Sequence, residues 1–349
     1  MLIIGLDIGG AYTKVAVLRV KGKKREVLDI GSDYFPFWKL SDKFPQFIRA
    51  RLPEAEKLIG VTMTAELADC FSSKGEGVEH ILNSVRSLAK TLVLSSSAEF
   101  INAEEALRYP LKVAASNWIA PPLLISRYVP NALFIDVGST TTDIVPIVDG
   151  KPSALGRNDL ERLSYGELVY TGALRTNLAT IVQSVPFRNN AIPVSSEYFS
   201  ITADVHLILD HMREEEYSCE TPDGSGKAKE DISRRIARLI CADMDMLDEA
   251  DVMCIANHIY KKQVEQIQAG LIHVIEQQHM DMERNTPVIL AGTGAPFLGN
   301  VAIRQLGYSD ITYFEEFVER YIGLSAEKTS VSAPAFSMAV LLTMEGMGK

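Results

Sequence analysis

The sequence predicts an α/β protein of two domains that carries a duplicated phosphate-binding hairpin. The first observation behind this prediction is the stretch at residues 133–148, LFIDVGSTTTDIVPIV, in which two apolar runs flank a hydroxyl-rich turn. The second is that residues 3–17, IIGLDIGGAYTKVAV, repeat the same order of residue types. The third is the length of 349 residues, which suits about two domains that each bury their own core.

The stretch at residues 133–148 has the pattern of a β-hairpin. Its first apolar run ends near Asp136, and Gly138 gives the tip the backbone freedom that a tight turn needs. The tip offers backbone N–H groups and the hydroxyls of residues 139–142, which are donors suited to phosphate oxygens. Asp136 beside the tip can hold a divalent cation through its oxygens.

The stretch at residues 3–17 aligns with this hairpin position by position. One match of this kind is typical of an ordinary hairpin, whereas two matches in register between apolar runs indicate an internal duplication. We therefore expect phosphate groups to lie in a cleft where the two tips face each other. The equivalent pairs are Asp7 with Asp136, Gly9 with Gly138, Gly10 with Ser139, Thr13 with Thr142, and Lys14 with Asp143.

The composition is typical of a soluble globular enzyme, with 47% apolar and 23% charged residues. The formal net charge of −10 argues against a nucleic-acid-binding protein, whose surface would be basic. Apolar runs reach only about ten residues, too short for a membrane span, and no signal peptide is evident. The four cysteines are widely spaced without a C-x-x-C pair, so we expect reduced thiols in a cytoplasmic protein.

The N-terminal domain is expected to span residues 1–131. Polar residues follow its strand at 57–63, and in an open α/β sheet ligands bind at the carboxyl ends of strands. Glu66 is therefore a candidate substrate-binding residue, although acids at a helix N-terminus explain the same pattern. The expected strands are 2–8, 13–20, 26–34 and 57–63, and the expected helices are 41–51, 77–94, a short one from 103 capped by Asn102, and 114–126 interrupted by Pro121 and Pro122.

The C-terminal domain is expected to span residues 132–349. Asp204 and His206, at the start of a predicted helix, are candidate ligands, and a capped helix explains them equally well. After the hairpin we expect a binding loop from 156, a helix from about 168, an irregular segment at 186–193, a helix at 202–212, a loop or flap at 214–230, helices at 232–241 and 250–277, a strand at 286–291, and a helix from 296.

A glycine turn follows the predicted strand at 286–291. Gly292 and Gly294 at this strand-to-helix junction allow a ligand to approach closely and aim a helix N-terminus at it. The last helix, at 333–346, is apolar and is expected to pack back between the domains. The sequence has no P-loop, no G-x-S-x-G elbow and no H-E-x-x-H motif, and its six histidines suggest no metal cage.

The order of these motifs resembles the actin, sugar-kinase and Hsp70 superfamily, whose domains have a ribonuclease-H-like fold. The stretches at 7–14 and 136–143 match its two phosphate motifs, and the turn at 292–294 matches its nucleoside motif. Ala11 departs from the threonine that is common in the first motif.

Longer stretches narrow this resemblance to one family. They are GVTMTAELADCF (60–71), SNWIA (116–120), FIDVGSTTTDIVP (134–146), GRNDLERLSYGELVYTGALRT (156–176), TADVHLIL (202–209) and APAFSMAVLL (333–342). The chain resembles the hydantoinase-A/oxoprolinase-like family, in the group linked to the tetrahydromethanopterin one-carbon pathway. The resemblance implies an archaeal transferase of methanofuran biosynthesis that joins γ-glutamyltyramine to (5-(aminomethyl)furan-3-yl)methyl diphosphate, forming an ether and releasing diphosphate.

For this chain the resemblance implies Mg²⁺ held by Asp7 and Asp136. Lys14 would stabilise charge on the departing oxygen, and Asp143 would act as general base toward a phenol with a pKa of about 10. Asp143 can instead form a salt bridge with Lys14, and an electron-rich furan can ionise ahead of attack without a strong base. The residues expected to bind phosphate are Gly9, Gly10, Thr13, Gly138, Ser139, Thr140, Thr141, Gly292 and Gly294.

The tyramine substrate also carries an α-carboxylate, which suits the bidentate fork of an arginine. Arg175 is the preferred candidate, followed by Arg157 and Arg162, because all three follow the second hairpin directly. In the alternative, these arginines pair on the surface with Asp159, Glu161 and Glu167.

Other functions would use the same phosphate clamp. One alternative is an ATP-dependent kinase or a hydantoinase/oxoprolinase-type ATP-hydrolysing enzyme, and another is a non-catalytic nucleotide-binding regulator. The expected partners are small-molecule substrates, with no nucleic acid and no membrane. A homo-oligomer is compatible with this expectation.

Overall fold

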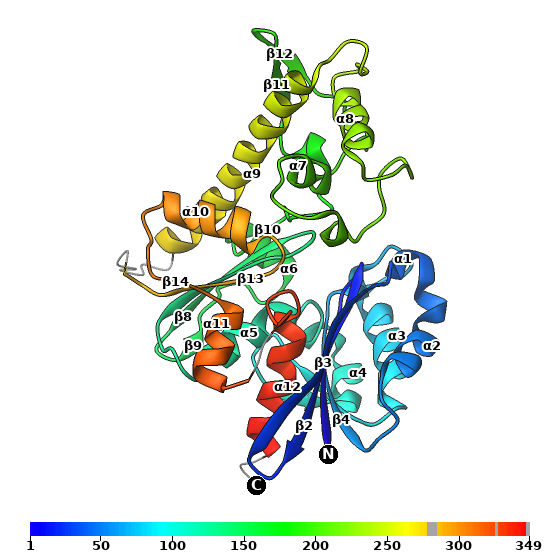
Figure 1. The fold of residues 1–349 in the computed structure, drawn as a ribbon. Coiled ribbons are helices and arrows are strands. Elements are labelled where there is room, and N and C mark those ends of the chain that lie inside the picture. The colour runs from blue at the N-terminus through cyan, green and yellow to red at the C-terminus, as the bar shows by residue number, and fades with distance from the viewer. Residues whose placement is uncertain (278–284, 325–326, 347–349) are drawn as a thin grey trace.

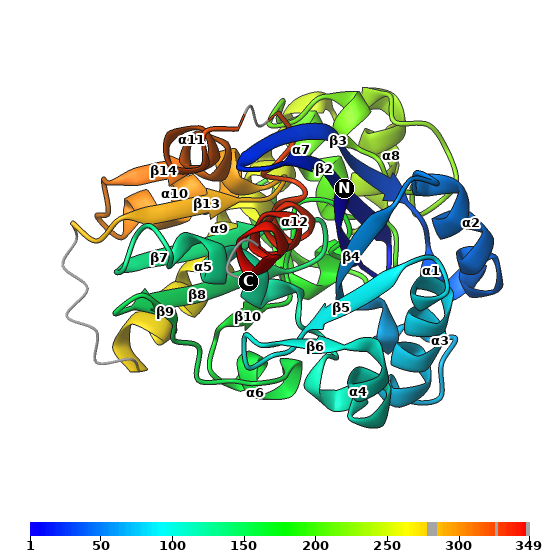
Figure 2. The same cartoon turned by 90° about the horizontal axis from the view of Figure 1, so that it is seen from below.

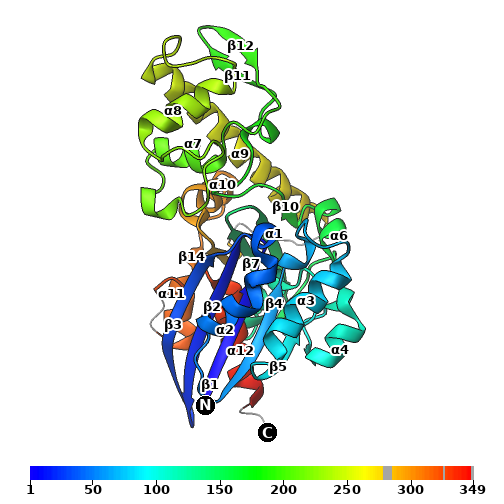
Figure 3. The ribbon, with the colours of Figure 1, turned by 90° about the vertical axis from the view of Figure 1, so that its right-hand side faces the viewer.

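The first of two large β-sheets is built by the N-terminal part of the chain. The computed structural model describes residues 1–277, 285–324 and 327–346. The strands of the first sheet are β1 (Leu2–Ile8), β2 (Tyr12–Lys21), β3 (Lys24–Tyr34), β4 (Lys57–Met63), β5 (Lys90–Leu94) and β6 (Phe100–Asn102). Their order across the sheet is β3-β2-β1-β4-β5-β6. Figure 3 labels the first five of these strands, β3 to β5.

The second large sheet begins at the central hairpin. Its strands are β7 (Ala132–Val137), β8 (Thr142–Val148), β9 (Lys151–Pro152), β10 (Leu168–Val169), β13 (Val288–Ala291) and β14 (Ile311–Tyr313). Their order is β10-β8-β7-β13-β14, with β9 paired to β8. A separate two-stranded hairpin is formed by β11 (Ser184–Phe187) and β12 (Asn190–Pro193).

The two sheets repeat one topology around their central strands. Strand β1 pairs antiparallel with β2 and parallel with β4, and β7 pairs antiparallel with β8 and parallel with β13. The register places Asp7 opposite Lys14 and Asp136 opposite Asp143. The predicted duplication and the ribonuclease-H-like α/β fold class are therefore confirmed.

Helices cover the first sheet on its outer face. Phe37, Phe44 and Ile48 share one buried cluster with Val78 and with side chains of β1, β2 and β4. The apolar positions of this helical layer recur at helical spacing, so one face of each helix is removed from water. The helices of this layer are α1 (Phe37–Leu40), α2 (Phe44–Arg51), α3 (Lys74–Arg86) and α4 (Ala103–Arg108).

The last helix, α12 (Ala333–Gly346), lies between the two sheets (Figure 2). It shares one buried cluster with Ile3 and Leu18 of the first sheet and with Phe134 and Ile147 of the second. Helix α5 (Ala120–Ile125) packs in the same cluster. The contact with β1 requires Gly5, because a Cβ atom there would lie 1.9 Å from the carbonyl oxygen of Ala335.

A third layer of helices extends from the second sheet. The long helix α9 (Glu249–Gln277) leads away from that sheet, and its far end packs with α7 (Thr202–Ile208), α8 (Lys229–Arg238) and β11–β12 around a separate apolar cluster (top of Figure 1). None of the described helices is both long and apolar enough to cross a membrane. The remaining helices are α6 (Asp159–Ser164), α10 (Asn300–Gln305) and α11 (Phe314–Phe317).

Four sequence predictions about elements are wrong, the first being the loop expected from 156, which contains helix α6 (Asp159–Ser164). The helix expected over 77–94 ends at Arg86, and Lys90–Leu94 forms strand β5. The helix expected from 168 is the short strand β10, and the segment expected to be irregular at 186–193 lies mostly in β11 and β12. For β5 and β10, pairing with a strand that is distant in the sequence overrides the local pattern. Strands β11 and β12 instead pair with each other as a local hairpin.

The close contact between β1 and α12 predicts a strong effect of Gly5→Ala. Because both neighbouring groups are backbone, neither can rotate away, and we expect the free energy of unfolding to fall by about 3 kcal/mol or more. The matched control is Gly75→Ala in α3, where the nearest atoms to a Cβ lie at 3.7 Å. Urea denaturation should show this control to be neutral or stabilised by up to about 1 kcal/mol; equal stability of the two variants would contradict the packing argument.

Candidate functional site

A cleft of about 430 Å³ lies where the tips of the two phosphate hairpins meet. We call residues 9–12 the first tip and residues 138–141 the second tip. Lys14, Asp136, Asp143 and Asp7 also line the cleft. The lining residues from the two tips are Gly9, Gly10, Ala11, Tyr12, Gly138, Ser139, Thr140 and Thr141.

The two tips have the same backbone geometry. The N–H of Gly9 donates to the carbonyl of Tyr12 at 2.9 Å, and the N–H of Gly138 donates to the carbonyl of Thr141 at 2.9 Å. These two amides close their turns. Five tip amides, those of Gly10, Ala11, Ser139, Thr140 and Thr141, have no hydrogen-bond acceptor among the described residues. They remain available to an anion.

A segment of the stretch at 156–176 fastens the second tip. The N–H of Ala173 donates to the carbonyl of Gly138, and the N–H groups of Leu174 and Arg175 both donate to the carbonyl of Ser139, each at 2.9 Å. Gly172 makes this approach possible, since a Cβ atom there would lie 2.5 Å from the nitrogen of Thr140. These contacts explain why the segment does not continue as a helix.

Two buried carboxylates lie beside the tips and leave oxygen atoms without protein partners. Asp7 Oδ2 lies 3.2 Å from Lys14 Nζ, whereas Asp7 Oδ1 is buried without a hydrogen bond among the described residues. Burial raises the pKa of Asp136 to about 7. The Lys14 ammonium lowers this pKa, whereas repulsion from Asp143 and Asp7 raises it further. Burial lowers the pKa of Lys14, but the three carboxylates outweigh it and raise this pKa overall.

The donor set at Asp7 and Asp136 fits Mg²⁺. Magnesium prefers oxygen ligands and is commonly held by one or two carboxylates together with substrate phosphates. In the described ranges no group of three or more His, Cys, Asp or Glu side chains forms a metal cluster of its own. A cation here would therefore be shared with phosphate oxygens rather than enclosed by protein.

Asp143 pairs with Arg162 and not with Lys14. Arg162 Nη2 lies 2.9 Å from Asp143 Oδ1 and 2.9 Å from the carbonyl oxygen of Glu167. The guanidinium also stacks on Trp118, 4.2 Å from the ring centroid, and is only 1% exposed. Burial raises the pKa of Asp143, and the Arg162 cation opposes that shift. Both alternatives, an Asp143–Lys14 salt bridge and a surface position for Arg162, are therefore wrong.

The other arginine candidates lie in different places. Arg175 lines the cleft, donates to Thr140 Oγ1 at 3.2 Å and stacks on Trp38 at 4.7 Å. Arg157 is exposed, does not line the cleft, and its backbone N–H donates to Glu161. The structure therefore brings Arg175, but not Arg157, to the two tips.

Three predicted phosphate-binding residues lie behind the cleft surface. Thr13 is fully buried, with its hydroxyl unpartnered in the described part of the chain. The N–H of Gly292 donates to Ser330 and the N–H of Gly294 donates to Val137. Gly292 has a φ of +90°, and a Cβ there would lie 2.4 Å from Asp136 Oδ1. Because Gly292 has no side chain, the Asp136 carboxylate can pack directly against its backbone.

The remaining candidates have structural roles. Asp204 is buried, accepts the N–H of Ile201 at 3.2 Å at the start of α7, and pairs with Arg235 at 2.6 Å. His206 hydrogen-bonds Gln263 at 2.9 Å, and burial with repulsion from His211 lowers the pKa of His206 to about 3. Asp204 and His206 therefore stabilise helix α7 and its surroundings, as the alternative of a capped helix predicts.

Aromatic residues of the cleft were not identified from the sequence. Three aromatic residues line it, Trp38, Tyr170 and Tyr12. Two polar residues, Asn117 and Asp69, line it as well. Trp38 lies in α1, about a hundred residues before the second tip, and no local pattern marks it. Asp69 follows β4 at the carboxyl edge of the first sheet, where the sequence did indicate ligand-binding residues.

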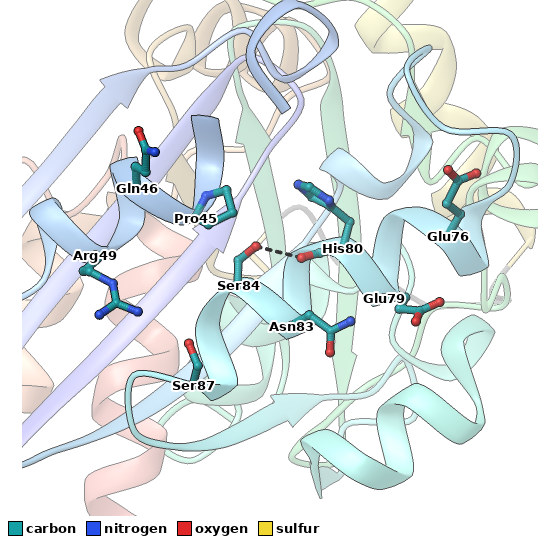
Figure 4. Close-up of a pocket in the computed structure, with 9 residues that line it drawn as sticks. All are labelled: Pro45, Gln46, Arg49, Glu76, Glu79, His80, Asn83, Ser84 and Ser87. Atoms are coloured by element: carbon teal, nitrogen blue, oxygen red, sulfur yellow. Dashed lines mark hydrogen bonds between the residues drawn. The ribbon is translucent and has the colours of Figure 1, made fainter. Parts of the chain in front are cut away.

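A second pocket lies outside the cleft, along α2 and α3 (Figure 4). It has a volume of about 580 Å³ and is lined by polar side chains such as Gln46, Arg49 and Asn83. The hydrogen bond drawn there, from Ser84 Oγ to the carbonyl of His80 at 2.8 Å, is an ordinary contact within one helix. Neither hairpin tip contributes to it, so the cleft between the tips is the candidate site.

Comparisons with known proteins agree with this assignment of the fold. A hydantoinase/oxoprolinase family model matches residues 57–326. The chain is 34% identical over 345 residues, covering 98% of each chain, to the (4-{4-[2-(gamma-L-glutamylamino)ethyl]phenoxymethyl}furan-2-yl)methanamine synthase of Methanocaldococcus jannaschii. It is 37% identical over 215 residues to the synthase of the same name from Methanococcus vannielii, covering 62% of this chain and 92% of the relative.

A solved structure shares the fold at low sequence identity. The nucleotide-free structure of an acetone carboxylase, titled for ATP-dependent acetone carboxylation, has a TM-score of 0.55 and 10% identity. The match covers 97% of this chain and 70% of that chain. At this identity the likeness concerns the fold alone.

Glu66 provides a pH-dependent test of the site's edge. Its side chain is buried beside the cleft without lining it. Burial raises the pKa of Glu66 from 4.5 to about 7, although Lys74, 3.8 Å away, opposes the shift. Between those pH values the folded protein holds more protons than the unfolded chain, so stability should fall as the pH rises.

Relative to Glu66→Gln, the wild-type protein should lose roughly 2 kcal/mol of unfolding free energy between pH 5 and pH 8. The glutamine variant lacks this titration and serves as the reference. Guanidinium denaturation of both proteins at four pH values measures the difference. Parallel pH profiles would show that Glu66 does not titrate in this range.

Proposed function

This chain belongs to the hydantoinase/oxoprolinase family, and from that premise we propose that it is a diphosphate-displacing transferase of methanofuran biosynthesis. Its proposed reaction joins γ-glutamyltyramine to (5-(aminomethyl)furan-3-yl)methyl diphosphate. The observation that carries the proposal is the 34% identity to the M. jannaschii synthase across 98% of both chains. The fold alone would allow many phosphate-transfer reactions.

The cleft geometry supports the diphosphate end of this proposal. The free amides of Gly10, Ser139 and Thr140 line the cleft from the two tips and would donate to phosphate oxygens. Asp7 and Asp136 would hold Mg²⁺, which when bound supplies positive charge that stabilises a departing diphosphate. Lys14 lies 3.2 Å from Asp7 and interacts electrostatically with Asp136, so its ammonium would stabilise the charge of the departing diphosphate.

The bond changes balance without an external reagent. The phenol oxygen of γ-glutamyltyramine forms a bond to the CH₂ carbon of the furan substrate. The bond from that carbon to the diphosphate oxygen breaks, and its electron pair leaves with the diphosphate. The phenolic proton passes to a base, so an ether and diphosphate are the products.

Asp143 is the proposed base. Arg162 engages Oδ1 of Asp143, whereas Oδ2 has no hydrogen-bond partner in the described part of the chain. Asp143 lines the cleft, so Oδ2 can accept the phenolic proton. Arg162 orients the carboxylate and is itself fixed by Trp118.

The reaction is tested by mass spectrometry with the two substrates and Mg²⁺. Formation of the ether together with diphosphate is the expected outcome. Parallel incubation with ATP separates the kinase or ATPase alternative, because substrate-stimulated ADP release would favour it. Absence of the ether from incubations with folded protein, both substrates and Mg²⁺ would overturn the proposal.

The metal assignment predicts a large effect of Asp136→Asn. Replacing the carboxylate removes one proposed Mg²⁺ ligand, so we expect turnover to fall at least about 100-fold with the fold retained. EDTA should stop the wild-type reaction, and added Mg²⁺ should restore it. Asp149→Asn, an exposed acid beyond the other end of β8, is the matched control. Full activity in EDTA would rule out this metal role.

The base assignment predicts that Asp143→Asn lowers kcat by about 100-fold or more, because an amide cannot accept the proton. The Michaelis constants should change little, since asparagine keeps the shape of the side chain. Thermal unfolding of the same variant provides the control. A lower Tm with unchanged kcat would assign Asp143 a structural role with Arg162 instead.

A further inference from the structure

Three cations line the cleft, and they differ in their partners. Lys14 lies 3.2 Å from Asp7, and Arg162 lies 2.9 Å from Asp143. Arg175 forms no ion pair with a carboxylate in the described ranges. It is therefore the lining cation whose charge remains available to an anionic ligand.

The backbone places Arg175 at the second tip. Its N–H donates to the carbonyl of Ser139 at 2.9 Å, and its Nη1 donates to Thr140 Oγ1 at 3.2 Å. The main chain and the side chain of one residue thus both contact the tip. An anion that accepts hydrogen bonds from the free amides of Ser139 and Thr140 would lie close to this guanidinium.

The first domain fixes the plane of the guanidinium. Arg175 Cζ lies 4.7 Å from the ring centroid of Trp38, which belongs to α1. Stacking occupies the face of the guanidinium and leaves its N–H edges for hydrogen bonds. A planar fork with a free edge suits a phosphate that offers two oxygens.

We propose that Arg175 binds the diphosphate group of the substrate and of the released product, and that Trp38 positions it from the opposite wall of the cleft. This assignment rests on the proposed function for its substrate and replaces the expected contact of Arg175 with the glutamyl carboxylate. The shared contact with Thr140 carries it, because that hydroxyl belongs to the phosphate-binding tip.

The direct test is calorimetric binding of inorganic pyrophosphate in Mg²⁺, which requires no turnover. Arg175→Ala should weaken binding at least tenfold, and Arg175→Lys should recover only part of it, since an ammonium lacks the planar fork. Arg213→Ala, an arginine whose side chain is 78% exposed and pairs with Glu216, is the matched control and should bind as wild type does. Binding by Arg175→Ala that equals wild type, or no binding by wild type, would overturn the proposal.

Steady-state kinetics give a second, independent readout. Arg175→Ala should raise KM for the furan diphosphate at least tenfold and leave KM for γ-glutamyltyramine within about twofold. A raised KM for γ-glutamyltyramine with an unchanged KM for the furan diphosphate would instead indicate that Arg175 binds the glutamyl carboxylate. If wild type forms no ether but binds pyrophosphate through Arg175, the proposed function fails and this assignment stands.

The role of Trp38 is tested by a pair of variants. Trp38→Phe keeps an aromatic face and should bind pyrophosphate within about threefold of wild type, whereas Trp38→Ala should weaken binding at least fivefold. A merely structural role would lower the Tm of Trp38→Ala without changing pyrophosphate affinity, and that result would remove Trp38 from the proposal.

Discussion

The burial of α12 between the two sheets is the constraint on which the site depends. Gly5 lets the helix backbone touch β1, and Gly60 lets Met338 and Leu342 pack against β4. Side chains from both sheets enter this one apolar cluster, whose removal from water stabilises their relative position. Since each hairpin tip extends from a central strand of its sheet, the packing of this helix sets the separation of the tips and hence the width of the cleft.

The cleft concentrates charge that the protein alone does not balance. Three cations line the cleft, Lys14, Arg162 and Arg175, whereas five carboxylates do, those of Asp7, Asp69, Asp136, Asp143 and Asp159. Burying this excess of carboxylate costs free energy, which is expressed in the raised pKa of Asp136. A site of this kind gains stability when a cation and an anionic ligand enter together. The same groups that destabilise the empty cleft are therefore suited to hold a metal-bound diphosphate.

The family stretch at 156–176 acquires a physical meaning in the structure. Arg162 forms an ion pair with Asp143. The segment at 172–175 donates three backbone hydrogen bonds to the second tip. Gly172 and Gly156 are needed because backbone or side-chain atoms occupy the space of a Cβ at both positions. The stretch thus supports the second hairpin at its tip and at the start of β8, and supplies Arg175 at its end.

The sequence by itself determined the two repeated hairpins, with Asp7 equivalent to Asp136 and Lys14 equivalent to Asp143, and strands β1 and β4, because these follow from local periodicity and short turns. Tertiary structure alone decided which charges meet. Arg162 contacts both Asp143 and Trp118, and Arg175 meets Trp38 across two domains. Short strands such as β5 and β10 also depended on distant partners. Contacts between residues far apart in the chain are set by packing, and no local pattern records them.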